Sequence, residues 1–225
     1  MSVRYNGAPE TDRSMRTLEH STAGAPRIAL GLLSGSYSTP EDFVRQGFPR
    51  AVEERGIAAW IVMAEVRAAY FSDGSVVARI REAVVAPAHA RGLTRVWLAG
   101  ISLGALAALA YAARHDEELE RIVLMSPYPG TREVLREIDA AGGLAAWQPE
   151  YLEPNPERDA WAWLRDRGSE APDVDCYFAS GDRFAEGQRR MASCLPQAAV
   201  HERDGAHEWE DWRGMWSDFL MRSAA

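Results

Sequence analysis

The chain has 225 residues, which suits a single domain with a substantial hydrophobic core. Hydrophobic residues make up 47% and charged residues 26%, a balance typical of a globular protein rather than a disordered one. The net charge of −8, without any Lys/Arg cluster, argues against nucleic acid as a partner, because phosphate binding needs concentrated positive charge.

Several features of the sequence bear on location. The N-terminus lacks the apolar segment of a signal peptide, and the longest apolar runs, 57–64 and 103–113, are too short to span a bilayer. The two cysteines, Cys176 and Cys194, have no metal-ligand spacing. We therefore expect reduced core thiols, no metal site and a cytoplasmic protein without a membrane span.

The first predicted element is a partly ordered N-terminal arm over residues 1–26, which are polar and show no clear periodicity. Beyond it, short apolar runs alternate with helical patterns. Apolar runs without alternation are typical of strands covered on both faces. They predict strands at 28–33, 57–66, 96–100, 122–126, 174–180 and 199–203. Helices are predicted at 41–54, 75–90, 103–115, 183–194 and 208–221.

The alternation of strands and helices predicts βαβ units with right-handed crossovers. We therefore expect an α/β fold in one domain over residues 27–225, with a doubly wound, mostly parallel sheet. No internal repeat or low-complexity tract interrupts it.

Residues 127–172 break this alternation, because they contain helical patterns at 131–141 and 158–167 but no predicted strand. This segment is either an elaborated crossover or a small helical cap over the mouth of the sheet, and we predict the cap. Trp147, Trp161 and Trp163 would serve in cap packing or form an acyl-binding surface.

The last predicted helix carries large apolar side chains at helical spacing. The residues that recur on one face of 208–221 are Trp209, Trp212, Trp216, Phe219 and Leu220. We interpret this face as part of the hydrophobic core and not as a ligand site.

Ser102 is the candidate nucleophile. It lies in Gly-Ile-Ser-Leu-Gly at 100–104, between the strand at 96–100 and an alanine-rich helix. A G-x-S-x-G sequence at a strand–helix junction is typical of a strained turn that exposes the serine Oγ, where larger side chains two positions away on either side would collide. The alternative is a serine that simply caps the helix.

A serine nucleophile needs a base, and a third residue to orient that base. The five histidines are His20, His89, His115, His201 and His207. His207 is the candidate base because it follows the last predicted strand, on the loop entering the final helix. Asp182 follows the preceding strand and is the candidate acid, whereas Asp175 lies at the wrong end of that strand. The alternatives are a surface loop histidine and an aspartate in a turn.

Two backbone N–H groups are candidates for the oxyanion hole. The Leu103 N–H lies at the start of the helix that follows Ser102, where the helix dipole favours negative charge. The loop after the first predicted strand offers the Ser36 N–H, or next the Tyr37 N–H. An ordinary turn is the alternative for this loop.

The order Ser102, Asp182, His207 resembles that of the α/β-hydrolase superfamily, over nearly all of residues 27–222. Gly-Ala-His-Glu-Trp-Glu-Asp-Trp-Arg at 205–213 looks like the segment around the histidine of several esterases. The resemblance is to small bacterial carboxylesterase- and thioesterase-like serine hydrolases, although 33–35 lacks their usual His-Gly or Pro-Gly.

The sequence and this resemblance together lead to a functional hypothesis. We expect hydrolysis of a small carboxylic ester or thioester through an acyl-enzyme, without a metal or organic cofactor. The alternatives are an acyltransferase that uses the same three residues and a non-catalytic protein of this fold that binds a ligand or partner. A His207 beyond hydrogen-bond reach of Asp182 would favour the second alternative.

Overall fold

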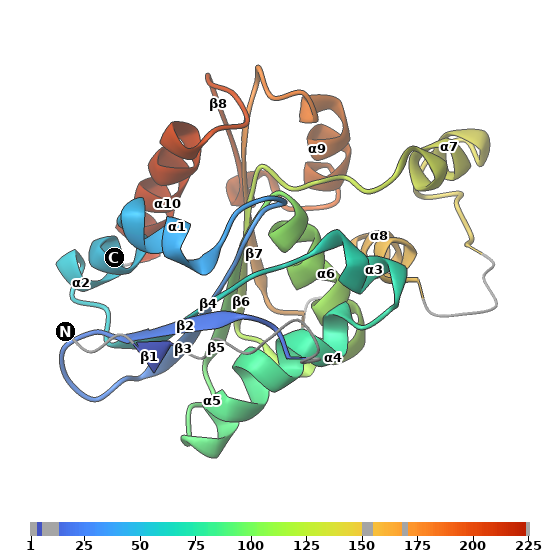
Figure 1. Cartoon of the computed structure of the whole chain (residues 1–225). Coiled ribbons are helices and arrows are strands. Elements are labelled where there is room, and N and C mark those ends of the chain that lie inside the picture. The colour runs from blue at the N-terminus through green and yellow to red at the C-terminus, as the bar shows by residue number, and fades with distance from the viewer. Residues whose placement is uncertain (1–3, 6–13, 150–154, 168–170, 224–225) are drawn as a thin grey trace.

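The computed structural model describes residues 4–5, 14–149, 155–167 and 171–223. An eight-stranded sheet runs through the molecule, in the order β1-β2-β4-β3-β5-β6-β7-β8 (Figure 1). The strands are β1 (Arg4–Tyr5), β2 (Thr17–Ser21), β3 (Ile28–Leu33), β4 (Ala59–Ala64), β5 (Val96–Ile101), β6 (Arg121–Met125), β7 (Asp173–Ala179) and β8 (Val200–Arg203). Strands β3 to β8 pair in parallel, whereas β1 and β2 join in antiparallel pairing. The predicted α/β fold with a mostly parallel sheet is confirmed.

Helices cover both faces of the sheet (Figure 1). They are α1 (Pro40–Arg45), α2 (Phe48–Glu54), α3 (Ala68–Ser72), α4 (Val76–Ile80), α5 (Ala86–Ala90), α6 (Leu103–His115), α7 (Arg132–Ala140), α8 (Pro156–Asp166), α9 (Ala185–Ala192) and α10 (Trp209–Ser223). Short η segments are η1 (Arg81–Val85), η2 (Asp116–Glu118) and η3 (Gln197–Ala199). Side chains of α1, α2 and α10 form one core cluster, and those of α4, α6 and α8 belong to the other.

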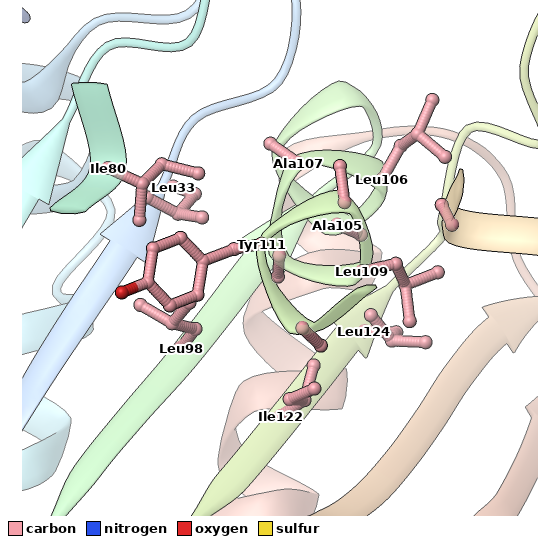
Figure 2. Packing of buried hydrophobic residues seen from close by; sticks show 14 of the residues in the cluster. Leu33, Ile80, Leu98, Ala105, Leu106, Ala107, Leu109, Tyr111, Ile122 and Leu124 are labelled. Carbon is pink, nitrogen blue, oxygen red and sulfur yellow. The ribbon is translucent and has the colours of Figure 1, made fainter. Parts of the chain in front are cut away.

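Helix α6 lies directly against the sheet, because its small side chains allow a close approach. Its fully buried residues include Ala105, Leu106, Ala108 and Leu109. Figure 2 shows Leu109 of α6 beside Leu124 of β6, and Tyr111 of α6 beside Leu98 of β5. This packing fixes the start of α6, where Ser102 lies, relative to the strands.

The single helix predicted at 41–54 is wrong, because two short helices replace it. Gly47 adopts a φ of 79°, a left-handed conformation that ends α1 and begins α2. The helix predicted at 75–90 is continuous but includes the π-helical segment η1 between α4 and α5. Extra residues in such a segment shift the helix register locally.

The N-terminal arm expected over residues 1–26 needs correction, because Thr17–Ser21 is strand β2 of the sheet. Its backbone pairs with β4 from Thr17 opposite Ala64 to Ser21 opposite Trp60. Only Leu18 of this strand is buried, so the segment lacks the apolar run that reveals the central strands. Residues 1–3 and 6–13 of the expected arm lie outside the described residues.

The segment expected to be a cap spans residues 127–172, and it contains helices α7 and α8, as predicted. Its residues 150–154 and 168–170 lie outside the described residues. Helix α8 packs on α6, and Arg114 pairs with Asp159 at 2.6 Å between them. Trp161 is fully buried, and its Nε1 donates to the Pro129 carbonyl at 2.9 Å. Helix α8 of the insertion therefore lies beside α6.

Among the described residues, no helix combines the length and apolar character needed to cross a bilayer.

Candidate active site

The candidate site lies at the carboxyl edge of the parallel strands. Ser102 follows β5, Asp182 follows β7 and His207 follows β8. The register aligns the ends of these strands, with Ile101 opposite Met125 and Ala179 opposite Arg203. Because parallel strands end at the same edge of a sheet, residues far apart in sequence meet there.

Ser102 occupies a strained turn between β5 and α6. Its φ of 53° and ψ of −112° lie in a region that non-glycine residues rarely adopt, at a cost of about 1–3 kcal/mol. Neighbouring backbone holds this conformation, because the Ser102 N–H donates to the Met125 carbonyl at 3.0 Å. The Tyr128 N–H donates to the Ser102 carbonyl, also at 3.0 Å.

Glycines flank this turn because no side chain fits at either position. A Cβ on Gly100 would lie 2.3 Å from backbone atoms of Gly104. A Cβ on Gly104 would lie 2.2 Å from the Leu33 carbonyl oxygen. As predicted from the sequence, a larger side chain at either position would collide, and it would do so with rigid backbone.

His207 lies between the other two candidate residues. Its Nε2 is 3.0 Å from Ser102 Oγ, and its Nδ1 is 2.7 Å from Asp182 Oδ2. The rings of Phe184 and Trp212 meet the imidazole edge-on, with centroids at 5.3 Å and 5.1 Å. Each ring nitrogen thus has one partner, and the aromatic rings restrict the orientation of the imidazole.

The Asp182 side chain is completely buried and accepts several hydrogen bonds. Gln188 Nε2 donates to Oδ2 at 2.9 Å, and the Phe184 N–H donates to Oδ1 at 2.8 Å. Burial would raise the pKa of the Asp182 carboxyl, but the hydrogen bonds from His207, Gln188 and Phe184 outweigh it. The pKa is therefore held below its ordinary value, and the group is a carboxylate at neutral pH.

The loops that carry Asp182 and His207 are tied to each other by their backbones. The Gly181 N–H donates to the Gly205 carbonyl at 3.1 Å, and the Ala206 N–H donates to Asp211 Oδ2 at 2.8 Å. Asp211 lies in the first turn of α10. The start of this helix thus fixes the loop that presents His207.

The two candidate oxyanion donors come from the start of α6 and from the loop after β3. Leu103 is the first residue of α6, and the N–H groups of a first helical turn have no partner within the helix. Gly35 to Ser38 form a turn closed by a bond from the Ser38 N–H to the Gly35 carbonyl at 3.2 Å. Tyr37 in this turn has a φ of 63°, and its side chain is fully exposed.

A cavity of about 380 Å³ opens beside Ser102. The rings of its aromatic walls belong to Tyr128, Phe184 and Trp212, and Gly35, Ser36, Tyr37, Arg183 and His207 complete the lining. The predicted core role of Trp212 is confirmed, since only 7% of the residue is exposed, but its ring also borders this cavity. Small ligands bind in cavities of this size with mostly apolar walls.

The other titratable residues considered in the sequence analysis lie outside the candidate active site. His201 is in β8 and pairs with Asp175 of β7 at 3.8 Å, away from the end of the strand that leads to Asp182. Cys176 and Cys194 are both free thiols, and burial raises the pKa of Cys176 to about 12. Within the described residues, no cluster of His, Cys, Asp or Glu is arranged to hold a metal ion.

Sequence reasoning missed several residues of this site. Arg183 and Phe184 directly follow Asp182, so their position after a strand end could have indicated a cavity wall. Tyr128 follows β6 in the same way. Gln188 gave no signal, because a glutamine on an amphipathic helix is ordinarily a surface residue.

Comparison with known families decides the classification. The Esterase family model matches residues 80–220, which include Ser102, Asp182 and His207. The chain belongs to the Esterase family. It is an esterase-type serine hydrolase with the α/β-hydrolase fold.

Solved structures agree with this esterase on the fold. The S-formylglutathione hydrolase of Staphylococcus aureus superposes with a TM-score of 0.69 at 12% identity, covering 100% of this chain and 97% of that one. Est1E from Butyrivibrio proteoclasticus gives a TM-score of 0.64 at 12% identity, with 99% and 98% covered. The monoacylglycerol lipase of Paleococcus ferrophilus gives 0.63 at 14% identity, with 94% and 100% covered. A sequence comparison with curated proteins finds no match.

Proposed function

We propose that this esterase hydrolyses a small carboxylic ester or thioester through an acyl-enzyme formed on Ser102. The supporting observation is the chain of contacts from Ser102 Oγ to His207 at 3.0 Å and from His207 to Asp182 at 2.7 Å. A His207 beyond hydrogen-bond reach of Asp182 would have favoured a non-catalytic protein of this fold. The distance of 2.7 Å is within that reach, so it supports the catalytic alternative. The contact between His207 Nε2 and Ser102 Oγ gives the serine a base within reach of its proton.

In the first half-reaction, Ser102 Oγ attacks the carbonyl carbon while His207 Nε2 takes its proton. Asp182 holds the Nδ1–H and stabilises the imidazolium. The oxygen of the tetrahedral intermediate then lies at the start of α6, where the Leu103 N–H and the Ser36 N–H donate to it. Removing one such donor lowers kcat by about 10²–10³ in enzymes of this kind.

Collapse of this intermediate breaks the bond to the alcohol or thiol, which leaves with the proton from His207. Water enters next, and His207 takes its proton as the water oxygen attacks the acyl-enzyme. His207 then returns this proton to Ser102 Oγ as the bond from Oγ to the acyl carbon breaks, so the acid product leaves and the hydroxyl of Ser102 is restored. The aromatic cavity of about 380 Å³ has room for a modest acyl or aryl group.

The direct test combines activity with labelling. Wild-type protein should hydrolyse p-nitrophenyl esters and become labelled by a fluorophosphonate at Ser102, while Ser102→Ala should do neither. Ser126→Ala is the matched control, since Ser126 is also a buried serine with a positive φ, of 45°, at the end of a neighbouring strand. Ester hydrolysis that persists in Ser102→Ala, or labelling at another residue, would refute the assignment.

A paired set of oxygen esters and thioesters with the same acyl group would establish which bond is preferred. We further propose a cytoplasmic location, which is supported by the free thiols of Cys176 and Cys194. Fractionation of the native cells would test it, and enrichment outside the cytoplasmic fraction would contradict it.

A further inference from the structure

Arg183 gives the cavity beside Ser102 a positive charge. Among the described residues that line this cavity, it is the one charged side chain besides the titratable His207. The other side chains around the mouth are aromatic or small. The whole chain carries a net charge of −8, so this positive charge is opposite in sign to the net charge of the protein.

No acidic side chain neutralises this charge in the part of the chain that the structure describes. Arg183 is exposed, and its guanidinium carbon lies 4.8 Å above the ring of Phe184. Its neighbour Arg190 differs, because it pairs with Asp139 and with Glu186, the latter at 3.3 Å. The N–H donors of the Arg183 guanidinium are therefore available to a ligand, and a cation–π contact with the Phe184 ring holds the guanidinium in place.

Arg183 and Phe184 also border a second cavity of about 290 Å³. Pro129, Leu135 and Gly187 line its other sides, together with Arg190 and its two acidic partners Asp139 and Glu186. The two cavities therefore share one wall, and Arg183 is in that wall. A substrate group that extends from the Ser102 cavity along this wall meets the guanidinium.

We propose that Arg183 is a specificity-determining residue that binds an anionic group, such as a carboxylate, on the substrate of this esterase. The proposal rests on the proposed function of Ser102 and names the substrate class for that site. A planar guanidinium recognises a carboxylate with two parallel hydrogen bonds. A single positive charge at an aromatic mouth also attracts anionic esters from solution.

The test compares anionic and neutral esters in matched pairs. An acyl-side pair is 4-nitrophenyl hemiglutarate and 4-nitrophenyl valerate, and an alcohol-side pair is 4-butyryloxybenzoate and its methyl ester. For at least one pair, Arg183→Gln should lower kcat/KM for the anionic ester about fivefold more than for the neutral ester. Added salt at about 0.5 M should weaken the wild-type preference, because it screens exposed charges.

Arg55→Gln provides the matched control. Arg55 is exposed at the end of α2, lines neither cavity, and its replacement changes the net charge by the same amount. It should leave the anionic-to-neutral ratio unchanged. An equal change in both variants, or no change of the ratio in Arg183→Gln for either pair, overturns the proposal.

These outcomes are distinct from failure of the proposed function. If the wild type hydrolyses neutral esters through Ser102 but shows no preference that depends on Arg183, only the anion site is wrong. If Ser102→Ala hydrolyses both pairs as well as the wild type does, the assignment of Ser102 and the proposal that rests on it are both wrong.

Discussion

Gln188 Nε2 donates to Asp182 Oδ2, the same carboxylate oxygen that binds His207 Nδ1. It also donates to the Pro127 carbonyl at 3.2 Å, so both hydrogens of the amide group are used. Gln188 is fully buried on α9. This side chain thus connects the helix after β7 to the carboxylate that orients the candidate base.

Gln188 is therefore expected to act as a positioning residue. Gln188→Met keeps a similar volume but removes both donors. Loss of a hydrogen bond to a buried carboxylate, worth about 1.5 kcal/mol, should lower kcat about tenfold. KM should change little, because Gln188 does not line the cavity beside Ser102. Steady-state kinetics on a p-nitrophenyl ester measures both parameters.

A readout of the Asp182 carboxyl separates this role from simple damage to the fold. Without the Gln188 donor, the pKa of Asp182 should rise toward its ordinary value. Activity should then begin to fall at a higher pH on the acid side in Gln188→Met than in the wild type. A lower kcat with an unchanged acid limb would mean that Gln188 acts only through packing.

The lowered pKa of Asp182 also predicts how stability depends on pH. A carboxyl whose pKa is lower in the folded protein stabilises it above the unfolded pKa, near the ordinary value of 3.8. This contribution is lost as the pH falls through the still lower folded pKa. Asp182→Asn should therefore destabilise the protein more at about pH 7 than at about pH 3. Urea unfolding at both pH values tests this, and an equal or larger loss at low pH contradicts it.

The central sheet and the candidate residues could be predicted from sequence for the same physical reason. Strands buried on both faces are continuous apolar runs, and in a parallel sheet all of them end at one edge. Ser102 and Asp182 each follow such a run closely, and His207 follows the short strand β8, so their meeting required no knowledge of side-chain packing. The two glycines beside Ser102 added a local steric signal.

The elements that were missed lack such signals. Strand β2 buries little more than Leu18, and its pairing with β4 depends on the fold of the rest of the chain. The break at Gly47 needs a left-handed conformation that glycine permits but does not require. Gln188 and the placement of α8 on α6 depend on tertiary contacts between segments distant in sequence, which periodicity does not encode.

Gly104 gives a sharp test of the strand–helix junction. In Gly104→Ala the new Cβ would lie 2.2 Å from the Leu33 carbonyl oxygen, and backbone on both sides cannot move apart cheaply. We expect a loss of about 3 kcal/mol or more in the free energy of unfolding. Gly35→Ala is the control, because its Cβ would meet atoms no closer than 3.4 Å. Thermal unfolding of both variants tests this, and equal melting temperatures would show that the junction can relax.

The tryptophans of the insertion and of α10 should differ in what they contribute. Trp216 is almost fully buried and stacks on Phe48 at 5.6 Å, with its Nε1 donating to the Phe48 carbonyl at 3.2 Å. Trp216→Ala should cost about 3–5 kcal/mol of stability. Because α10 holds the loop of His207, kcat should also fall at temperatures below the melting transition.

Trp163 is half-buried on α8, its Nε1 donates to Asp116 at 3.0 Å, and it does not line the cavity beside Ser102. Trp163→Ala should therefore destabilise the protein less than Trp216→Ala does, while KM and kcat for short and long acyl esters remain unchanged. A KM that rises with acyl chain length in Trp163→Ala would instead assign this tryptophan to an acyl-binding surface, which its contacts with the protein core argue against.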